Sequence, residues 1–591
     1  MDDFVGSQFE EQDAQSELKM VSNGFSGATS TATDDWTIDP ELFAFTPRRL
    51  RVVCIGAGFA GLTLAYKLKH ERPLDFVDFT IYERNSEVGG TWLKNVYPGV
   101  GWYVALRSLK ILMLSTILIK EDSYVFPFEP NPTWSKFYVS GAEIQQYILN
   151  TTEKYGLKDK IIFDRHLVES IWDEEQGKWE LRLESKEGVI QDKADILINA
   201  GGILHQWKWP ELEGLESFKG KLIHSARWDS AYDWTGKKVA VIGNGSSGIQ
   251  IVPAVQPKAA KLVNYIRHAT WIAANICGHL TKDGSNFEFT EEEKQRFLEN
   301  PEEFSQYRKR IESEVNSVFR MMISGSKENK FMFDLCDKLM RDRLAKNPEL
   351  IEKLIPNYEI GCRRISPGDG YLEALQAENA KCCFGDIKRI TEKGIETDEG
   401  EEEFDLIVCA TGFNTRFIPS WKLVGRDGRR LDIAWKDKPE AYLSVCAPGI
   451  PNYFMFAGPN FPVGHGSIPP AFGWSADYML DWTTKIATED IKSIVVKDSV
   501  VRDYNRYAQE NLKRMVWSKG CHAWYKSAKG DNRVVTAMYP GSVMHYKSAL
   551  EIIRGEHFDI GYNTSNQFRF MGNGQLAWEM EEGADFAPYV K

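Results

Sequence analysis

The sequence has no cysteine pair at the spacing that redox motifs and zinc ribbons use. Its nine cysteines stand at positions 54, 277, 336, 362, 382, 383, 409, 446 and 521, and no two form a Cys-x-x-Cys motif. Because the number is also odd, we expect neither a disulfide framework nor a metal site. Reduced thiols in a cytoplasmic protein are the interpretation that we prefer.

Long apolar runs and a targeting signal are absent as well. The longest candidate, Ile111 to Ile119, is far shorter than the roughly 20 apolar residues that a membrane-spanning helix needs. The N-terminus begins Met1-Asp2-Asp3, whereas a secretory signal begins with basic residues. We therefore expect a cytoplasmic protein without stable membrane insertion. The acidic, Ser- and Thr-rich composition of residues 1–45 predicts a disordered tail.

The chain also lacks an excess of basic residues. It carries 72 Lys and Arg against 84 Asp and Glu, a formal net charge of -12. Proteins that bind nucleic-acid backbones normally present a basic surface, so we do not expect a nucleic-acid partner. Hydrophobic residues make up 43% and charged residues 26% of the chain, as in globular proteins. A length of 591 residues suggests two to four domains.

A first dinucleotide-binding motif follows a short apolar strand, Val52 to Ile55. The motif is Gly56-Ala57-Gly58-Phe59-Ala60-Gly61. In such a turn the first glycine (Gly56) makes the bend, the second (Gly58) admits a pyrophosphate, and the third (Gly61) lets the helix approach the strand. The next strand ends in Glu83, where an acid binds ribose hydroxyls. This context predicts a site for an adenosine without a 2′-phosphate, as in FAD.

A second motif, Gly243-Asn244-Gly245-Ser246-Ser247-Gly248, follows the strand Lys238 to Ile242. The strand after it, Leu262 to Ile266, ends in Arg267 instead of an acid. A guanidinium pairs with a 2′-phosphate in a forked geometry, which an acid would repel. We therefore predict an NADPH site here, although a solvated charge at a strand end is the simpler alternative for Arg267. The residues assigned to this site are Gly243, Gly245, Ser246, Ser247, Gly248 and Arg267.

Two strand–glycine–helix units predict an α/β fold with two Rossmann-like domains. From about residue 285 to 358 the sequence is rich in Glu, Lys, Arg and Phe at helical spacing, which predicts a helical insertion. We assign residues 46–212 to the first part of the FAD domain and 213–385 to the NADPH domain with its insertion. Residues 386–591 are assigned to the second part of the FAD domain and a C-terminal segment.

The segment between the two motifs narrows the choice of enzyme class. Disulfide reductases also have two dinucleotide domains, but they need the redox-active cysteine pair that this sequence lacks. The segment fits the pattern FxGxxxHxxxW(P/D) at Phe218, Gly220, His224, Trp228 and Asp229. From about residue 49 to 546 the chain thus resembles the Baeyer–Villiger (class B) flavoprotein monooxygenases, which use FAD and NADPH. The resemblance implies that His224 couples domain movement to cofactor binding and is not a general base.

Further motifs fit the same family. Gly89-Gly90-Thr91-Trp92 and Tyr97-Pro98-Gly99 are similar to its signature beside the flavin, which assigns Gly90, Thr91, Trp92 and Tyr97 to the cofactor site. Asp405 with Ala410-Thr411-Gly412, which follow the strand Leu406 to Cys409, looks like the point where the chain returns to the FAD domain. Motifs near the C-terminus resemble the lining of the flavin and nicotinamide, and among them we assign Trp524 to the cofactor site. These motifs are Gly458-Pro459-Asn460, Gly464-His465-Gly466 and Trp524-Tyr525.

Within this family the chain resembles the fungal secondary-metabolite oxygenases. This narrower resemblance is carried by Gly361-Cys362-Arg363-Arg364 and Tyr539-Pro540-Gly541-Ser542. It implies that Arg364 is the catalytic cation and that Arg363 assists Arg267 on the 2′-phosphate, although an ordinary basic loop is the alternative. The implied reaction uses NADPH, FAD and O₂ to convert a ketone into an ester or lactone. A fixed cation suits this reaction because negative charge develops on the attacking oxygen, and arginine stays protonated.

One segment departs from the family pattern. The flavin-side signature ends in an aspartate four residues after the glycine of Tyr97-Pro98-Gly99, and this chain has Tyr103 there. Residues 102–122 are richer in Leu and Ile than the family's segment, and the family pattern resumes at Ser123. The segment is either a genuine variation or translated intron sequence. We favour the second, because Trp102-Tyr103-Val104 can be encoded by bases containing GTATGT, a typical fungal intron start.

Two other functions stay open. One is an N- or S-oxygenating flavin monooxygenase, against which the motif ending in Asp229 and the Arg363-Arg364 pair both argue. The other is a folded flavin-binding protein whose altered 102–122 segment prevents productive oxygenation.

Overall fold

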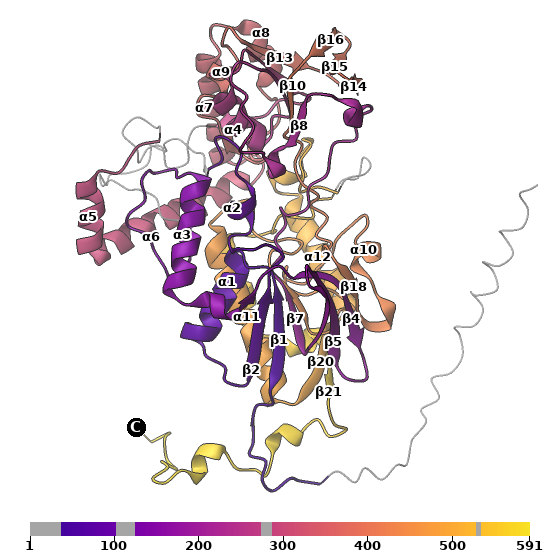
Figure 1. Cartoon of the computed structure of the whole chain (residues 1–591). Coiled ribbons are helices and arrows are strands. Elements are labelled where there is room, and N and C mark those ends of the chain that lie inside the picture. Colours follow the sequence, from indigo (N-terminus) through magenta and orange to yellow (C-terminus); the bar gives the residue numbers. More distant parts are fainter. Residues whose placement is uncertain (1–36, 102–124, 274–285, 528–533, 591) are drawn as a thin grey trace, which may run out of the picture.

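The computed structural model describes residues 37–101, 125–273, 286–527 and 534–590. Two predictions fall wholly or largely elsewhere: most of the disordered tail, and the segment 102–122 with Tyr103, lie outside the described residues. The described chain forms two parallel sheets, one in the upper and one in the lower part of Figure 1, with helices around each.

The first sheet is parallel and has the strand order β19-β7-β1-β2-β3. Its central strand β1 (Leu50–Ile55) is almost entirely buried between its neighbours, as expected for an apolar run in a parallel sheet. Helix α1 (Phe59–Tyr66) leaves the end of β1 and packs against α11 (Ile468–Thr488). The other strands are β2 (Val77–Tyr82), β3 (Ile161–Ile162), β7 (Ile196–Asn199) and β19 (Tyr453–Met455).

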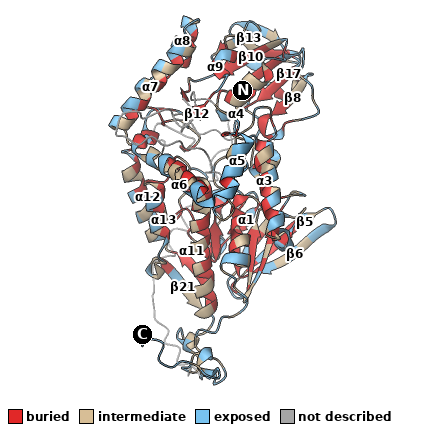
Figure 2. Cartoon of the chain, turned by 90° about the vertical axis from the view of Figure 1, so that its left-hand side faces the viewer, coloured by how far each residue is buried: buried red, intermediate tan, exposed pale blue. Residues whose placement is uncertain are grey.

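The second sheet is also parallel, with the order β13-β10-β9-β17-β8. Helix α4 (Ser246–Val255) follows β9 as α1 follows β1. The three inner strands of this sheet, β10, β9 and β17, are buried along most of their length (Figure 2), whereas the edge strands β13 and β8 are only partly buried. The strands are β8 (Lys221–His224), β9 (Lys238–Ile242), β10 (Lys261–Ile266), β13 (Ala380–Phe384) and β17 (Leu406–Cys409). The predicted α/β fold with two Rossmann-like units is confirmed.

Strand β17 corrects one expectation. The expected boundary at residue 385 assigned Leu406 to Cys409 to the FAD domain, but this strand lies in the second sheet, between β9 and β8. A run of four buried apolar residues fits the centre of either parallel sheet, so the sequence does not specify which one it joins. The sheet of the second unit therefore extends to residue 409, beyond the expected boundary at 385.

Smaller sheets flank the two parallel ones. An antiparallel hairpin set beside the first sheet consists of β4 (His166–Asp173), β5 (Lys178–Ser185) and β6 (Gly188–Ala194), and β18 (Lys422–Val424) adds to β4 in parallel. Another set consists of β14 (Arg389–Ile390), β15 (Gly394–Thr397) and β16 (Gly400–Glu403). Strands β20 (Ile491–Val496) and β21 (Phe558–Tyr562) pair with each other, as do β11 (Ile272–Ala273) and β12 (Ser366–Pro367).

The predicted helical insertion is present and joins the two units. It consists of α5 (Glu291–Glu299), α6 (Pro301–Ser317), α7 (Lys327–Arg343) and α8 (Pro348–Leu354). A capping box of Thr290 and Glu293 starts α5, and a proline in the first turn starts α6. Apolar side chains of α5 and α6 belong to the core around the first sheet, whereas those of α7 and α8 belong to the core around the second. The insertion therefore stabilises the arrangement of both units.

The remaining α-helices are distributed around the two parallel sheets. They are α2 (Thr91–Lys94), α3 (Gly141–Lys154), α9 (Tyr371–Ala374), α10 (Leu431–Ala434), α12 (Asp498–Leu512) and α13 (Val543–Leu550). The C-terminal segment crosses the start of the described chain, where the N–H of Ala44 donates to the carbonyl of Gln575 at 2.8 Å. Within the described ranges, no helix combines the length and apolar character needed to cross a bilayer.

Candidate active site

The two glycine turns have the same construction. Gly56 and Gly243 both have a φ of +109°, a backbone conformation that favours glycine. A Cβ atom on Gly56 would lie 2.7 Å from the carbonyl oxygen of Ala200, and one on Gly243 would lie 2.6 Å from that of Ala410. These two contacts are backbone contacts, so a side chain at either position would displace the neighbouring strand.

The other glycines separate into tight and open positions. A Cβ on Gly61 would lie 2.1 Å from the oxygen of Gly56, and one on Gly248 would lie 2.3 Å from the oxygen of Gly243. By contrast, a Cβ on Gly58 would come no closer than 3.7 Å to another atom, and one on Gly245 would meet nothing within 4 Å. The tight positions let helix and strand touch, and the open positions leave room for a pyrophosphate beside the backbone.

The N-termini of α1 and α4 point to the same use. The N-cap residues are Gly58 and Gly245, and neither helix has a side chain that caps its first turn. First-turn N–H groups have no partner within a helix, and together with the helix dipole they attract anions. Both turns therefore fit the phosphates of a dinucleotide.

The residues that follow the second strand of each unit differ, as the sequence indicates. Glu83 follows β2 and is buried, and its carboxylate accepts hydrogen bonds from the N–H groups of Ala57, at 2.7 Å, and Asn85, at 2.9 Å. Arg267 follows β10 and is exposed. The guanidinium of Arg363 donates to the carbonyl of Ala269 at 3.0 Å, so it lies beside the strand end that carries Arg267.

A cavity of about 840 Å³ opens at the first glycine turn. Six predicted site residues from the N-terminal part of the chain line it together with the distant Arg364, namely Gly56, Gly58, Glu83, Gly90, Thr91 and Trp92. Trp524, near the C-terminal end, lines it as well. The structure thus brings the predicted flavin turn, the predicted catalytic arginine and the C-terminal tryptophan to one cavity.

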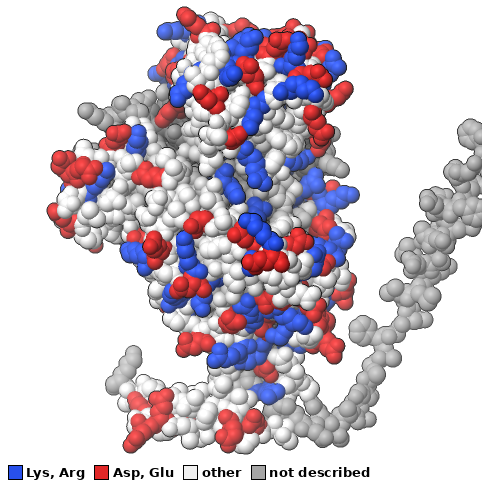
Figure 3. Space-filling view, in the orientation of Figure 1, with Lys and Arg blue, Asp and Glu red and all other residues white. Residues whose placement is uncertain are grey.

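The lining of this cavity is mainly basic among its charged residues. Among the described residues of the lining Glu83 is the one acid, and the basic residues are Arg84, Lys94, Arg165, Arg227 and Arg364. Basic side chains also gather in the middle of the face shown in Figure 3, between the upper and lower parts of the molecule. Burial and the neighbouring charges of Arg227 and Arg84 lower the pKa of Lys94. A concentration of cations in a concave site favours an anionic ligand.

His224 lies behind this cavity and not in its lining. It ends β8 and is fully buried, with its ring stacked on Trp207 at a centroid distance of 4.9 Å. Its Nδ1 atom accepts from the N–H of Ala226 at 3.1 Å, and Nε2 lies 3.4 Å from the hydroxyl of Thr411. Burial lowers the pKa of His224 to about 4, so the ring is neutral at pH 7. Trp207 and Ala226, which line the cavity, were not predicted from the sequence.

The other fingerprint residues support the same strand. A Cβ on Gly220 would lie 2.8 Å from the carbonyl oxygen of Asp405, so only glycine fits beside β17. Phe218 and Trp228 are buried, and Asp229 forms an ion pair with Lys221. In this structure these four residues hold β8 and the chain that leaves it in place.

Tyr97 lies between the two units. Its hydroxyl donates to the side-chain oxygen of Gln250 on α4 at 2.8 Å, and the Ser247 hydroxyl lies 3.5 Å away. In the adjacent turn, Gly99 has a φ of +80°, and a Cβ there would lie 2.4 Å from the carbonyl of Gln250. Tyr97 is not part of the cavity lining, so its assignment to the cofactor site stays a prediction.

Comparison with known proteins identifies the family. A family model described as flavin-binding monooxygenase-like matches residues 49–329. The FAD-binding monooxygenase tazF of Aspergillus terreus is 64% identical over 94% of this chain and 97% of its own length. A Baeyer–Villiger monooxygenase of Pseudomonas aeruginosa is 34% identical over 85% of this chain and 89% of its own length.

This chain belongs to the flavin-binding monooxygenase family. Its fold agrees with that assignment, because cyclohexanone monooxygenase from Rhodococcus sp. Phi1, solved with NADP⁺, matches 88% of the chain with a TM-score of 0.73 at 22% identity. The match covers 100% of that chain. The predicted resemblance to Baeyer–Villiger-type flavin monooxygenases is confirmed. FAD and NADPH, the cofactors predicted from the two glycine turns with Glu83 and Arg267, are the cofactors of this enzyme type.

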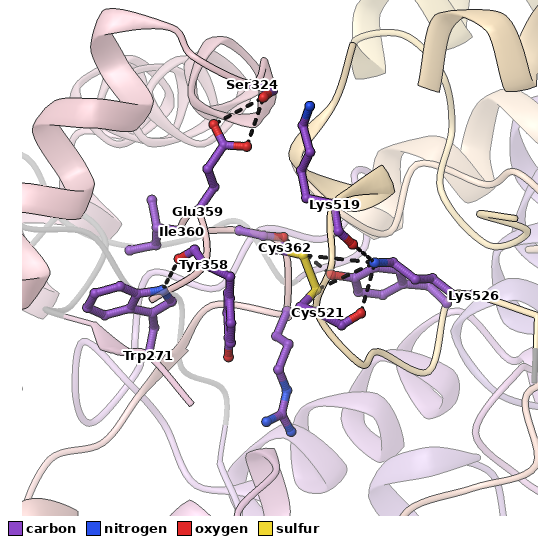
Figure 4. The surroundings of a disulfide bond; sticks show 12 residues. Trp271, Ser324, Tyr358, Glu359, Ile360, Cys362, Lys519, Cys521 and Lys526 are labelled. Carbon is purple, nitrogen blue, oxygen red and sulfur yellow. Dashed lines mark hydrogen bonds between the residues drawn. A yellow bond between two sulfur atoms is a disulfide. The ribbon is translucent and has the colours of Figure 1, made fainter. Parts of the chain in front are cut away.

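The flavin monooxygenase has a disulfide bond that we did not expect. Cys362 and Cys521 are joined, with their Cα atoms 6.0 Å apart (Figure 4). The two cysteines are separated by 159 residues in the sequence, so no local spacing could reveal the pair. The expectation of reduced thiols throughout is therefore wrong. The other described cysteines are free, as expected; they stand at positions 54, 336, 382, 383, 409 and 446.

Proposed function

We propose that this flavin monooxygenase inserts one oxygen atom of O₂ beside the carbonyl carbon of a ketone and releases an ester or lactone. The observation that carries the proposal is the position of Arg364 in the lining of the cavity that begins at Gly56 and Gly58. A guanidinium there would lie beside the place where a flavin held by the first glycine turn reacts with oxygen.

The cofactor sites follow from the two units. Gly56, Gly58, Gly61 and Glu83 would hold FAD, with Gly90, Thr91 and Trp92 beside it. Residues 46–212 and the chain after residue 409 would form most of the FAD domain, and residues 213–409 the NADPH domain. Gly243, Gly245, Ser246, Ser247 and Gly248 would hold the pyrophosphate of NADPH, and Arg267 and Arg363 would bind its 2′-phosphate.

Arg364 would then perform the charge stabilisation. The activated oxygen for this reaction would come from FAD held in this site, with NADPH as the source of electrons. When oxygen attacks a carbonyl, negative charge develops on the oxygen atoms, and a fixed cation nearby lowers the barrier most when it needs no rearrangement. Arg364 stays protonated at every working pH. It also directly follows Arg363 in the sequence, and the guanidinium of Arg363 is held in place by a hydrogen bond to the carbonyl of Ala269 at 3.0 Å.

We further propose a bulky, polycyclic or polyketide-derived ketone as substrate, in fungal secondary metabolism. Support comes from the resemblance at Gly361-Cys362-Arg363-Arg364 and from the 64% identity to tazF of a fungus. The cytoplasmic location expected from the sequence stays a prediction.

The test is product analysis under isotopically labelled O₂. A panel of small cyclic and polycyclic ketones is incubated with the enzyme and NADPH, beside an alkyl aryl thioether and a tertiary amine. We expect esters or lactones that carry one labelled oxygen atom, with polycyclic ketones preferred. Sulfoxide or N-oxide without any ester would favour the N- or S-oxygenating alternative. Consumption of NADPH with hydrogen peroxide and no oxygenated product from any compound would favour the impaired flavoprotein.

A further inference from the structure

The disulfide bond joins two segments of the cavity wall. Cys362 lies two residues before Arg364, and Cys521 lies three residues before Trp524, and both Arg364 and Trp524 line the cavity. Figure 4 shows that the two segments approach from opposite sides of the bond. A covalent link at this point therefore fixes the distance between the proposed catalytic cation and the C-terminal wall.

The Cys362 segment is firmly attached to the second unit without the bond. The hydroxyl of Tyr358 donates to the carbonyl of Ala269 at 2.9 Å, and the Arg363 guanidinium donates to the same carbonyl at 3.0 Å. The indole N–H of Trp271 donates to the carbonyl of Tyr358 at 2.9 Å. These contacts hold the segment to the chain that leaves β10.

The Cys521 segment has weaker contacts with the Cys362 side. The Tyr525 hydroxyl donates to the carbonyl of Gly361 over 3.3 Å, and the ring of His522 stacks on His268 at 4.8 Å. Cys521 itself is buried but lies between Gly520 and His522, which are exposed. Of the two cysteines, Cys521 is therefore the one nearer to solvent, because Cys362 is completely buried.

A buried lysine lies directly at the sulfur atoms. The Lys526 ammonium is 3.6 Å from Sγ of Cys521 and 3.9 Å from Sγ of Cys362 (Figure 4). It donates to the carbonyl oxygen of Cys521 at 2.9 Å and to that of Lys519, which fix its position. A cation beside a sulfur atom favours the thiolate over the thiol, and the thiolate is the reactive form in disulfide exchange.

We propose that Cys362 and Cys521 are a reversible redox clamp on the cofactor cavity, and that Lys526 keeps the opened pair reactive. A dithiol reductant would open the clamp: its thiolate attacks Sγ of Cys521, Cys362 leaves as a thiolate, and the second thiol of the reductant displaces Cys521. Two electrons and two protons thereby pass to the two cysteines, and the reductant becomes a disulfide. The reverse exchange with an oxidised dithiol closes the clamp.

The clamp acts on geometry and not on the reacting atoms. When it is closed, the Trp524 segment is joined covalently to the arginine segment, and when it is open non-covalent contacts, such as those of Tyr525 and His522, hold it there. We expect the open enzyme to have a KM for NADPH at least threefold higher and, without a ketone, to release hydrogen peroxide faster than the closed enzyme. These readouts do not require a ketone substrate, so they are independent of the proposed ester-forming reaction.

The experiment compares the FAD-loaded enzyme after equilibration with dithiol and oxidised-dithiol buffers. Free thiols are alkylated in denaturant, and the linked peptides are identified by mass spectrometry, while NADPH kinetics and peroxide release are measured on the same samples. Cys521→Ser should have the kinetics of the open enzyme, and its KM and peroxide release should be the same in both buffers. Cys382→Ser, which changes a free cysteine on β13, should respond as the wild type does. A linked pair in the wild type whose opening changes neither KM nor peroxide release overturns the clamp, as does the absence of a linked peptide.

Lys526 is tested separately by alkylation of the native, reduced enzyme. Lys526→Met removes the charge, and we expect Cys521 to be alkylated about tenfold more slowly at pH 7, because one pKa unit in a thiol changes its thiolate fraction about tenfold. Lys526→Arg should restore most of the rate. FAD content and the thermal midpoint report whether each variant is folded. Equal alkylation rates in folded wild-type, Met and Arg variants would remove Lys526 from the proposal.

Discussion

The guanidinium of Arg363 donates to the carbonyl oxygen of Ala269 at 3.0 Å, two residues beyond Arg267 in the sequence. Through this contact the arginine pair at 363 and 364 lies across the exit of β10. One member can therefore face the proposed 2′-phosphate site while the next lines the cavity at the first glycine turn. Adjacent residues would serve two different cofactors, and the two roles can be separated by mutation.

Arg267→Ala and Arg363→Ala should each weaken the preference for NADPH over NADH. A hydrogen bond to a charged group is worth roughly 1.5–3 kcal/mol, which corresponds to a loss of about ten- to a hundredfold in apparent NADPH affinity. The affinity for NADH should change little, because NADH has no 2′-phosphate. Saturation curves with each cofactor measure the effect, with Arg389→Ala on β14 as an exposed control. If both variants keep the wild-type preference, the 2′-phosphate site lies elsewhere.

The two open glycines give a reciprocal pair of variants. Gly58→Leu should abolish FAD retention, because its side chain would fill the open space beside the turn, where a Cβ atom would come no closer than 3.7 Å to another atom. Gly245→Leu should leave FAD bound and raise the KM for NADPH. The flavin absorbance of the purified proteins and their NADPH saturation curves give the result. A Gly58→Leu protein with a full complement of FAD would show that the first site is misplaced.

The sequence predicts these turns because each glycine has a local physical cause. The residues of a strand–turn–helix unit themselves determine its backbone geometry. This geometry includes the φ of +109° at Gly56 and Gly243 and the close backbone contacts at Gly61 and Gly248. Features that depend on distant segments could not be predicted in the same way. Tertiary packing sets three such features: the partner of Tyr97 on α4, the place of β17 between β9 and β8, and the bond between Cys362 and Cys521.

Arg364→Ala should separate flavin reduction from oxygenation. The variant should bind FAD and oxidise NADPH within about tenfold of the wild-type rate, because hydride transfer depends on cofactor alignment. Ester formation should fall by about a hundred- to a thousandfold, the usual cost of removing a preorganised group that stabilises developing negative charge. Product yield and hydrogen peroxide are measured together, and Arg364→Lys tests whether charge alone suffices. Wild-type ester yield from the alanine variant would remove Arg364 from the catalytic role.

Glu312 should make the enzyme less stable at alkaline pH. This residue of α6 accepts a hydrogen bond from the Ser467 hydroxyl at 2.8 Å, and burial raises its pKa to about 7. A carboxyl with a raised pKa binds its proton more tightly in the folded than in the unfolded chain. Its contribution to stability is therefore complete below about pH 4.5 and is lost as the pH rises through 7.

Glu312→Gln keeps the shape and removes the titration. Relative to wild type it should be stabilising at pH 8.5, by an amount on the order of 1 kcal/mol, with a smaller difference at pH 5. Thermal midpoints across this range, measured with saturating FAD, give the comparison, and Glu314→Gln on the exposed side of α6 is the control. A difference that is the same at every pH would exclude Glu312 as the cause.

The last prediction concerns residues 102–122, whose described neighbours contact α4 and α3. The Gln250 side chain donates to the carbonyl of Gly101 at 3.0 Å, and Gly101 bridges to Ser140 before α3. In the family an aspartate holds the position that Tyr103 has here, and a phenol is neutral at pH 7, so it cannot pair with an arginine as a carboxylate does.

A misplacement of a catalytic group by about 1 Å can cost on the order of a hundredfold in rate. We therefore expect the chain with its present segment to bind both cofactors but to form ester slowly, or to lose part of the NADPH that it consumes as hydrogen peroxide. Replacing the segment with the family's shorter Cys-Asp-containing version should couple NADPH use to product. Sequencing the transcript across Gly101 to Ser123 shows whether the segment is present in the mature message. Full coupling in the unaltered chain, with no gain from the replacement, would mean that Tyr103 marks a functional variant and not a defect.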